Sequence, residues 1–460
     1  MPHRHRLVTV TGLATVLAAA LACGRAPQTT SAGIDAPRAD TSPVVTSIPS
    51  PAGPGSGEPA LASAGGRAYL SWIERRGEDG EALLFATWDG ATWTPPRAIA
   101  EGVPFFVNWA DTPSILPMAD GTLVAHWLQK AGGETYAYHV MLSWSADAGS
   151  TWSPPVSPHE DQSATEHGFV SLVDLGPGRF GAAWLDGRKY AAASGGSAET
   201  ALMFAEYRDG ASRGEVVLDT RVCDCCQTAA AATAAGVVVA YRDRSPEEVR
   251  DISRVVVPIE PAAAPAPNGV AAPTPVPAPA PLSREGWTIA GCPVNGPAIA
   301  ASGDHVIAAW FTGERDSKRV FAAFSADGGA TFRDPIRIDL GQPVGRVDVD
   351  WLAPGRALVA WIEDGTGGDA AANADNARDD AARIMGQAVD AGGRAGEPLV
   401  LATTRSARAS GFPRLARVSG NLLLAWTEPG DPPHVRIVRI VTPSRPGTGP
   451  DSPARPAPRS

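Results

Sequence analysis

An eight-residue segment occurs twice in this chain, at 145–152 as SADAGSTW and at 325–332 as SADGGATF. In both copies Asp and Gly supply a tight turn, because Asp accepts hydrogen bonds from nearby amides and Gly adopts positive φ at little cost. A turn that recurs in the same form within one chain predicts a fold built from repeats. The residues that carry the pattern are Ser145, Asp147, Gly149, Thr151 and Trp152 in the first copy and Ser325, Asp327, Gly329, Thr331 and Phe332 in the second.

The segment resembles the Asp-box (BNR) repeat, S-x-D-x-G-x-T-W, of the sialidase superfamily and related β-propellers. Weaker copies stand at 88–93, 207–210 and 390–393. The resemblance implies a β-propeller and, for an active member, an exo-α-sialidase-like glycoside hydrolase.

A second repeat consists of short apolar strands, each centred on one aromatic residue. Each such strand follows a short apolar strand and a turn, and precedes a third and usually a fourth strand. Four short strands with regular turns are typical of a propeller blade. We therefore predict an all-β propeller of four-stranded blades over residues 43–441, with seven blades, six being the alternative. The aromatic residues recur every 51 to 69 positions and are Trp72, Trp127, Trp184, Tyr241, Trp310, Trp361 and Trp426.

The two ends of this region are expected to pair. The seventh unit stops at its third strand, 435–441, and an extra strand at 43–48 stands ahead of the first unit. If these two strands paired, they would complete the last blade and remove an exposed sheet edge. Two insertions interrupt the repeats, a Pro/Ala-rich stretch at 261–283 and an acidic loop at 365–382.

Residues 1–23 resemble a bacterial export signal with a lipoprotein cleavage site. Arg4 and Arg6 precede an apolar run, and Cys23 follows small residues. Lipidation of Cys23 would anchor the protein to a membrane, with ordinary signal cleavage as the alternative. We expect 24–42 to be a flexible tether and 442–460 a disordered tail. The predicted location is the cell envelope, periplasmic or on the outer surface.

The net charge bears on possible partners. The chain has 39 Lys and Arg against 49 Asp and Glu, a formal charge of −10, and no basic stripe. This composition argues against a nucleic-acid partner. The expected partners are a glycan or small acidic ligand, and the membrane through the N-terminal lipid. The protein is expected to be a monomer.

A four-stranded blade has two rims. The turns that join strands three and four lie on one rim, termed the Asp-box rim. The loops that lead into strand one, and those that join strands two and three, lie on the other, where propellers usually have their central sites. Because the cysteines stand in these loops, we term it the cysteine rim. Charged residues and thiols from units two to six gather there.

Four cysteines follow Cys23 in the sequence. Cys223, Cys225 and Cys226 lead into unit four and Cys292 leads into unit five, so neighbouring blades bring them together. In an oxidising compartment an even count favours disulfides, here one that links Cys292 to another of the four. The alternative is a zinc or copper(I) site on the C-x-x-C spacing of Cys223 and Cys226. Its other ligands would come from Cys225, Cys292 or His167.

The sialidase resemblance implies three arginines that clamp a sugar carboxylate, a task suited to the bidentate geometry of Arg. Glycoside hydrolysis also needs an acid and a nucleophile or base that flank the scissile bond. We assign Asp111 as the acid and Tyr241 with Glu166 as the nucleophile pair, Glu248 and Glu314 being other partners for the tyrosine. The candidate substrate-binding residues are Arg188, Arg242, Arg244, Arg254, Arg315, Arg346, Trp109 and Asn295.

Two other functions fit the same residues. One is a non-enzymatic envelope propeller that binds a ligand or a protein around a disulfide-braced centre. The other is a metal-binding propeller with cysteine ligands. The alternative role for each of the candidate arginines is a structural ion pair with a nearby aspartate.

Overall fold

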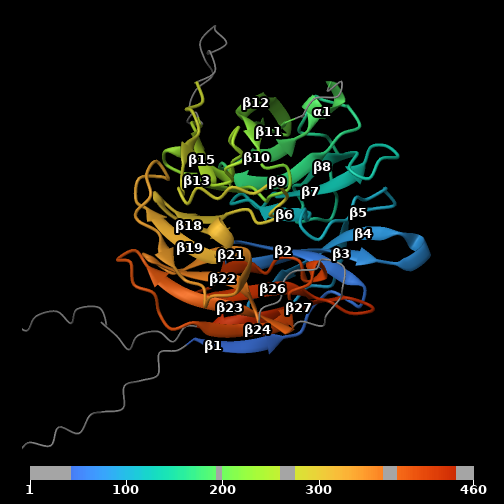
Figure 1. Cartoon of the computed structure of the whole chain (residues 1–460). Coiled ribbons are helices and arrows are strands. Elements are labelled where there is room, and N and C mark those ends of the chain that lie inside the picture. Colours follow the sequence, from blue (N-terminus) through green and yellow to red (C-terminus); the bar gives the residue numbers. More distant parts are fainter. Residues whose placement is uncertain (1–42, 193–198, 260–274, 366–380, 442–460) are drawn as a thin grey trace, which may run out of the picture. The chain divides into compact units, whose positions relative to one another are not determined.

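The computed structural model describes residues 43–192, 199–259, 275–365 and 381–441, which form seven antiparallel sheets arranged as propeller blades (Figure 1). Six of these sheets have four strands and one has three. In all but the last, strand order follows the chain, because each strand pairs with the next through a turn. The prediction of an all-β, seven-bladed propeller is confirmed, and the six-bladed alternative is wrong.

The strands of each blade run from the propeller axis outward in chain order. The first three blades contain β2 (Ser56–Ala64), β3 (Arg67–Arg75), β4 (Glu81–Trp88) and β5 (Arg97–Glu101); β6 (Ser114–Pro117), β7 (Leu123–Lys130) and β8 (Tyr138–Ser145); and β9 (His167–Asp174), β10 (Arg179–Asp186), β11 (Thr200–Arg208) and β12 (Ala211–Val222). The next three contain β13 (Ala229–Thr233), β14 (Gly236–Arg242), β15 (Ile252–Val257) and β16 (Ala280–Pro281); β17 (Ala298–Ser302), β18 (His305–Thr312), β19 (Arg319–Ser325) and β20 (Ile336–Arg337); and β21 (Pro343–Ala353), β22 (Arg356–Asp364), β23 (Ala381–Asp390) and β24 (Leu399–Arg405). Short helices are α1 (Arg188–Ala192) and 3₁₀ turns at Gly77–Asp79, Glu314–Asp316 and Arg408–Ser410.

The seventh blade closes the ring with a strand from the other end of the chain. It contains β25 (Arg414–Val418), β26 (Asn421–Glu428) and β27 (His434–Val441), and its outermost strand is β1 (Val44–Ile48). β1 runs antiparallel to β27, with Val44 opposite Val441 and Ile48 opposite Ile437. The N-terminal strand therefore completes the last blade, as the sequence predicted.

Several predicted segments lie outside the described residues. These are the export signal with Cys23, the tether, the tail, and the parts of the two insertions at 261–274 and 366–380. The described remainder of the first predicted insertion, 275–283, contains β16, so the fourth strand of its blade lies inside that stretch. Among the described residues, no helix is long and apolar enough to span a bilayer.

The aromatic residue of each repeat lies on the second strand of its blade. All seven are buried, and Trp72, Trp184, Trp310 and Trp361 are at most 1% exposed. They pack with the apolar side chains of adjacent blades; Trp361, for example, belongs to a cluster with Ala309 and Val320 of the blade before it. Burial of such large side chains is a main source of propeller stability.

The Asp-box segments form the turns after the third strands. In the first copy Asp147 Oδ1 accepts hydrogen bonds from the Thr151 amide at 2.8 Å and from the Ser145 hydroxyl at 2.8 Å. Gly149 has φ +80°, and a Cβ there would overlap the Phe85 ring of the preceding blade. The turn therefore closes its own hairpin and also packs on the adjacent blade.

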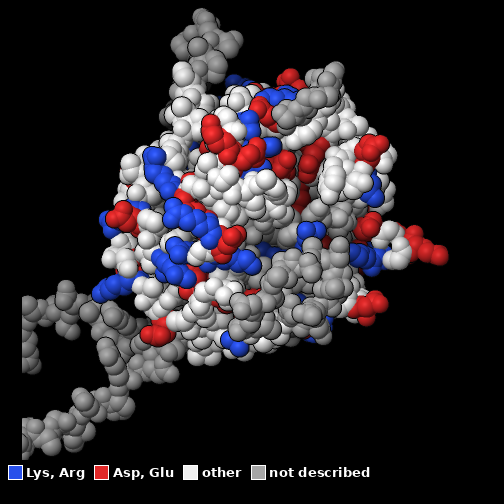
Figure 2. Space-filling model, in the orientation of Figure 1, with Lys and Arg blue, Asp and Glu red and all other residues white. Residues whose placement is uncertain are grey.

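The innermost strands surround a central cavity of about 530 Å³. Small side chains of β2, β13 and β17 line much of it, so the axis is not filled. Figure 2 shows Lys and Arg interspersed with Asp and Glu across the face seen in Figure 1.

Candidate functional site

Three side chains from two adjacent blades meet on the cysteine rim. Asp111 precedes β6, Tyr138 begins β8, and Glu166 directly precedes β9. The Tyr138 hydroxyl lies 2.7 Å from Glu166 Oε1 and 3.2 Å from Asp111 Oδ2, so it bridges two carboxyl groups. A backbone bridge between Tyr138 and Glu166 holds the two blades together at this point. We term these three residues the relay cluster.

The backbone beside Asp111 is shaped to hold its carboxyl group. Phe169, with φ +53°, donates its amide N–H to Asp111 Oδ1 at 2.8 Å. Gly168 lies against the other oxygen, and a Cβ at this position would overlap Asp111 Oδ2. A glycine is therefore required at 168 while Asp111 keeps this position.

The single hydroxyl proton of Tyr138 cannot form hydrogen bonds to two ionised carboxylates at once. Tyr138 donates to one carboxylate, so the other must carry a proton of its own to bond the phenolic oxygen. Burial raises the pKa of Asp111 to about 8, against the Phe169 amide, and the charge of Glu166 adds to the rise. Burial also raises the pKa of Glu166 to about 7, against the Tyr138 hydroxyl and with help from the charge of Asp224. At neutral pH Asp111 is therefore the protonated end of the cluster.

The relay cluster links the interior to the surface. Asp111 is 2% exposed and lines the central cavity, whereas Glu166 is partly exposed. Tyr190 of α1 is 43% exposed, and its pKa is raised by burial and by the charges of Asp224 and Glu166. The Tyr190 amide donates to the Gly187 carbonyl oxygen and the Gly187 amide to that of Glu166, both at 2.8 Å, so Tyr190 lies beside Glu166. Asp224, whose charge acts on both residues, is the second carboxylate of this group. We term Glu166, Asp224 and Tyr190 the rim site.

Arg414, which the sequence analysis did not single out, lies at the central cavity. It is the one arginine among the described cavity-lining residues, which include four aspartates. Arg414 donates to Thr112 Oγ1 at 3.3 Å, and burial lowers the pKa of its guanidinium. Burial raises the pKa of Asp348, against the charge of Arg414 and the Leu415 amide. The cavity thus carries more acidic than basic groups.

Two of the six candidate arginines are buried against backbone carbonyls. Arg242 donates to the carbonyl oxygens of Asn295, Arg250 and Phe311 at 2.5 to 2.8 Å. Arg346 donates to those of Ala407, Gly411 and Ser406 at 2.8 to 3.2 Å, and burial lowers its pKa to about 10. Both therefore tie loops of the cysteine rim together.

The other four candidate arginines are also engaged. Arg188 pairs with Asp186 and Glu215, Arg244 with Glu248, and the exposed Arg315 with Glu314. Arg254 donates to carbonyl oxygens of Gly329 and Ala330 in the second Asp-box, away from the cysteine rim. The structure does not bring any three of the six to the central cavity, because none of them lines it.

The Tyr241 hydroxyl is bonded to none of the three glutamates proposed as its partners. The Tyr241 hydroxyl donates to Asp219 Oδ2 at 2.5 Å. Glu248 accepts from Arg244 and Arg250, which lower its pKa to about 2. The tyrosine that contacts Glu166 is instead Tyr138. No motif in the sequence marked that residue.

Trp109 and Asn295 take part in packing on the same rim. Trp109 stacks on Phe412 with ring centroids 5.9 Å apart, and the Arg346 guanidinium lies 4.7 Å from its ring centre. Asn295 Oδ1 accepts the Arg346 amide at 2.6 Å, and its Nδ2 donates to the Pro293 carbonyl at 3.1 Å. These contacts account for both side chains without a ligand.

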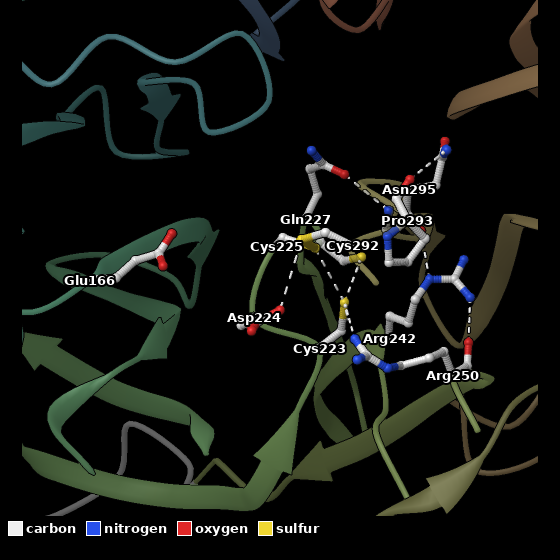
Figure 3. Close-up of a disulfide and its surroundings, with 12 residues drawn as sticks. Glu166, Cys223, Asp224, Cys225, Gln227, Arg242, Arg250, Cys292, Pro293 and Asn295 are labelled. Atoms are coloured by element: carbon white, nitrogen blue, oxygen red, sulfur yellow. Dashed lines mark hydrogen bonds between the residues drawn. A yellow bond between two sulfur atoms is a disulfide. The ribbon is translucent and has the colours of Figure 1, made fainter. Parts of the chain in front are cut away.

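The cysteines form one disulfide and one close pair of thiols (Figure 3). Cys225 is bonded to Cys292 across two blades, the type of pairing expected from the even count. Cys223 and Cys226 are buried, with their Sγ atoms 2.9 Å apart. Burial acts to raise the pKa of Cys223, but hydrogen bonds from Cys226 and the Cys225 backbone, with nearby guanidinium charges, lower it to about 7. The disulfide removes two of the four sulfurs from any metal site.

The surroundings of the cysteines are charged. Arg250 Nη1 lies 3.3 Å from Cys223 Sγ. Figure 3 shows the Glu166 side chain extending from the neighbouring blade toward the cysteine-bearing loop that carries Asp224. His167, the other candidate metal ligand, lies with His139 and His159 instead.

No protein-family model and no curated protein match this sequence. Among solved structures, the polysaccharide lyase Uly1 matches over 84% of this chain and 90% of its own, with a TM-score of 0.51 and 10% identity. The phage phi92 endosialidase matches over 91% and 72%, with a TM-score of 0.47 and 11% identity. A NanB sialidase from Streptococcus pneumoniae matches over 88% and 71%, with a TM-score of 0.42 and 10% identity. The chain therefore has a β-propeller fold similar to that of Uly1.

Proposed function

We propose that the protein is a glycan-active propeller that hydrolyses glycosidic bonds at the rim site. The observation that carries the proposal is the Tyr138 hydroxyl, which joins Glu166 at 2.7 Å to the buried carboxyl of Asp111 at 3.2 Å. A carboxyl group that exchanges a proton through a fixed hydroxyl is suited to general acid–base catalysis. The fold of Uly1, a polysaccharide lyase, shows that glycan chemistry can be built on such a scaffold.

Each residue of the site has a distinct role in this proposal. Glu166, the partly exposed end of the relay cluster, receives the proton of Asp111 through the Tyr138 hydroxyl and donates it to the leaving-group oxygen. Asp224, whose charge acts on Glu166, is the second carboxylate that hydrolysis requires. Tyr138 and Asp111 position Glu166 and return its proton, and the exposed ring of Tyr190 offers a face for a sugar.

The charges favour a neutral glycan over a sialoside. All six candidate arginines have hydrogen-bond or ion-pair partners within the protein, as described above. An anionic sugar would also approach the carboxylates of Glu166 and Asp224. Like charges at short range repel each other, so a sialic acid without an arginine clamp would bind poorly.

The test is an assay of the full-length protein against fluorogenic neutral hexosides and pentosides and a fluorogenic sialoside. Wild type should release the fluorophore from at least one neutral glycoside. Glu166→Gln should lower kcat/KM by about 100-fold or more, because the acid is lost. The matched control is Glu247→Gln, at an exposed position in the loop between β14 and β15 on the same rim, which should keep full activity.

The possible outcomes separate the candidate functions. Turnover of the sialoside alone would favour the exo-α-sialidase. An unchanged rate in Glu166→Gln would overturn the assignment of Glu166. If no glycoside is cleaved and a glycan array shows binding that Tyr190→Ala abolishes, the protein is a binding propeller and the hydrolytic proposal fails.

We also propose that the protein is exported and lipid-anchored through Cys23. A disulfide such as Cys225–Cys292 is typical of proteins in oxidising compartments. Metabolic labelling with an alkyne fatty acid in a bacterial host should label wild type and leave Cys23→Ala unlabelled. Equal labelling of both proteins, or of neither, would contradict the anchor.

A further inference from the structure

Three histidines lie together between the second and third blades, beside the relay cluster. His139 follows Tyr138 in β8, His167 begins β9, and His159 lies in the segment between these strands. One ring nitrogen from each lies within 4.8 Å of the other two. His159 is 3% exposed, His167 is fully buried, and His139 is partly buried. Polar side chains this deep in a protein are normally hydrogen-bonded.

Each of these rings has a nitrogen without a hydrogen-bond partner among the described residues. The three atoms are His139 Nδ1, His159 Nε2 and His167 Nε2, and all are buried. The rings of His159 and His167 are stacked with centroids 4.0 Å apart, and the His139 ring lies 5.0 Å from the first and 5.4 Å from the second. The three rings therefore form one compact group with unsatisfied nitrogens.

The remaining nitrogens determine the tautomers of the two buried rings. His159 Nδ1 lies 2.6 Å from the carbonyl oxygen of Asp161, and His167 Nδ1 lies 3.2 Å from that of Thr165. Because a carbonyl oxygen can only accept, both Nδ1 atoms carry a proton, so each ring has a lone pair at Nε2 whenever it holds no second proton. Metal-bound histidines usually donate their other N–H to a carbonyl or carboxylate in this way.

Two carboxylates face this group of rings. Asp161 Oδ2 lies 3.0 Å from His167 Nε2, yet the pair lacks the geometry of a hydrogen bond. A lone pair directed at a carboxylate is repulsive unless a cation, either a second proton on the ring or a metal ion, stands between them. Asp186 Oδ1 is 3.8 Å away and is already bonded to Arg188, while its other oxygen accepts the Trp184 indole N–H. Asp161 Oδ2 also accepts hydrogen bonds, from the hydroxyl and the amide of Ser163, but it is the closer of the two carboxylates. Asp161 is therefore the better-placed carboxylate to share a cation with His167.

We propose that His139, His159, His167 and Asp161 bind one divalent transition-metal ion, with zinc the best match. Imidazole and carboxylate are common zinc ligands, and four such donors complete a tetrahedral site. The same imidazoles would also bind nickel(II) and copper(II), whose affinities for such ligands follow the Irving–Williams order. On binding, the stacked rings of His159 and His167 would tilt so that their lone pairs converge on the ion.

The site goes beyond the proposed hydrolysis, since none of its donors belongs to the rim site or the relay cluster. It joins β8 to the start of β9, the two elements that place Tyr138 and Glu166. The proposed role of the ion is structural, to fix these two elements relative to one another. Its test therefore needs no activity measurement.

The test uses full-length protein treated with EDTA and then titrated with Zn²⁺ by calorimetry. Wild type should bind one Zn²⁺ per chain, and saturating Zn²⁺ should raise Tm. His139→Gln should lower the affinity by at least about tenfold. This side chain is partly exposed, so the variant should still fold, which circular dichroism can verify. His305→Gln, at an exposed position in β18, is the matched control and should bind like wild type.

Substitution with Co²⁺ separates this site from the cysteines. Histidine and carboxylate ligands should give visible d–d bands without the intense near-ultraviolet thiolate absorption. Cys223→Ser should leave the spectrum unchanged. The proposal is overturned if EDTA-treated wild type takes up no Zn²⁺, if His139→Gln binds as wild type does, or if thiolate absorption appears and is lost in Cys223→Ser.

Discussion

The two rims of the propeller place the same side chain in opposite environments. On the Asp-box rim, Asp147 and Asp327 each accept hydrogen bonds from a threonine amide and hydroxyl, and from a serine hydroxyl, within their own turn. The pKa of both falls to about 2. On the cysteine rim, Asp111 accepts one amide N–H and faces a second carboxyl group across Tyr138. Burial raises its pKa to about 8.

This difference in pKa distinguishes carboxylates that stabilise the fold from carboxyl groups that can transfer a proton. A carboxylate bonded by several donors is stable as an anion and has no reason to protonate near neutral pH. A buried carboxyl beside another acid titrates in the physiological range, which is the condition for acid–base chemistry. The Asp-box rim is therefore structural, and the cysteine rim is where chemistry is expected.

The largest expected effect is on activity and concerns Tyr138. Tyr138→Phe removes the hydroxyl that joins the two carboxyl groups, so kcat toward the best glycoside should fall about 100-fold while KM stays nearly constant. Asp147→Asn, on the other rim, should leave kcat unchanged. Steady-state kinetics of the two variants tests the contrast. Equal activities would show that the rims do not differ in function.

The next effect concerns the bond that braces the cysteine rim. Cys292→Ser opens the disulfide to Cys225, which closes a loop across 67 residues. Loss of such a bond should lower the free energy of unfolding by about 2–4 kcal/mol. Guanidinium unfolding with and without dithiothreitol measures it, and the reductant should shift wild type but not the variant. A reductant-insensitive wild type would rule out a stabilising disulfide.

Asp111→Asn should change stability in a pH-dependent way. An ordinary Asp pKa of about 3.9 in the unfolded chain lies below the folded value of about 8, so folded wild type holds more protons between these values. Its stability therefore falls as the pH rises from about 4 to about 8. Asn keeps both hydrogen bonds and cannot ionise, so the variant should gain in Tm relative to wild type from pH 5 to pH 9. A difference in Tm that is constant across this range would contradict the raised pKa.

Asp327→Asn should give the smallest effect and one of opposite sign. The lowered pKa of Asp327 adds stability that is fully present above about pH 4 and is lost as the pH falls through about 2. The variant should therefore have a slightly lower Tm at pH 7 and approach wild type near pH 2. Thermal melts at these two pH values check the prediction. A stabilised variant at neutral pH would contradict it.

The fold could be predicted from sequence because its signals are local and repeated. An Asp-box is a complete hydrogen-bonded turn within eight residues, and it sets strand order wherever it occurs. The aromatic residue of each second strand is buried in all seven blades, so the repeat of Trp72 to Trp426 reports the blade count directly. The spare strand at 43–48 was recognisable because the last unit lacked one.

The site could be predicted only in part, because its residues meet through tertiary contacts. Asp111 and Glu166 stand in loops that the rim argument singled out. Their partner Tyr138 is a strand residue that belongs to no motif. Tyr241 had the more prominent position in the repeat, yet its hydroxyl is taken by Asp219. The useful signal was a polar pair, Tyr138 and His139, at the start of a strand whose other residues are mostly apolar.

The arginines show the limit of composition as a guide. Their number on the cysteine rim suggested a carboxylate clamp, but an arginine can equally serve a set of backbone carbonyls. Arg242 and Arg346 each bond three such oxygens, which no sequence pattern distinguishes from ligand binding.

The central claim is that Asp111 on the cysteine rim and Asp147 on the Asp-box rim are in opposite protonation states at neutral pH. Infrared spectroscopy detects the C=O stretch of a protonated carboxyl group directly. The difference spectrum of wild type minus Asp111→Asn at pH 7 should contain this band, and that of wild type minus Asp147→Asn should not. If the Asp111 difference shows only carboxylate bands, Asp111 is ionised and the account of the relay cluster is wrong.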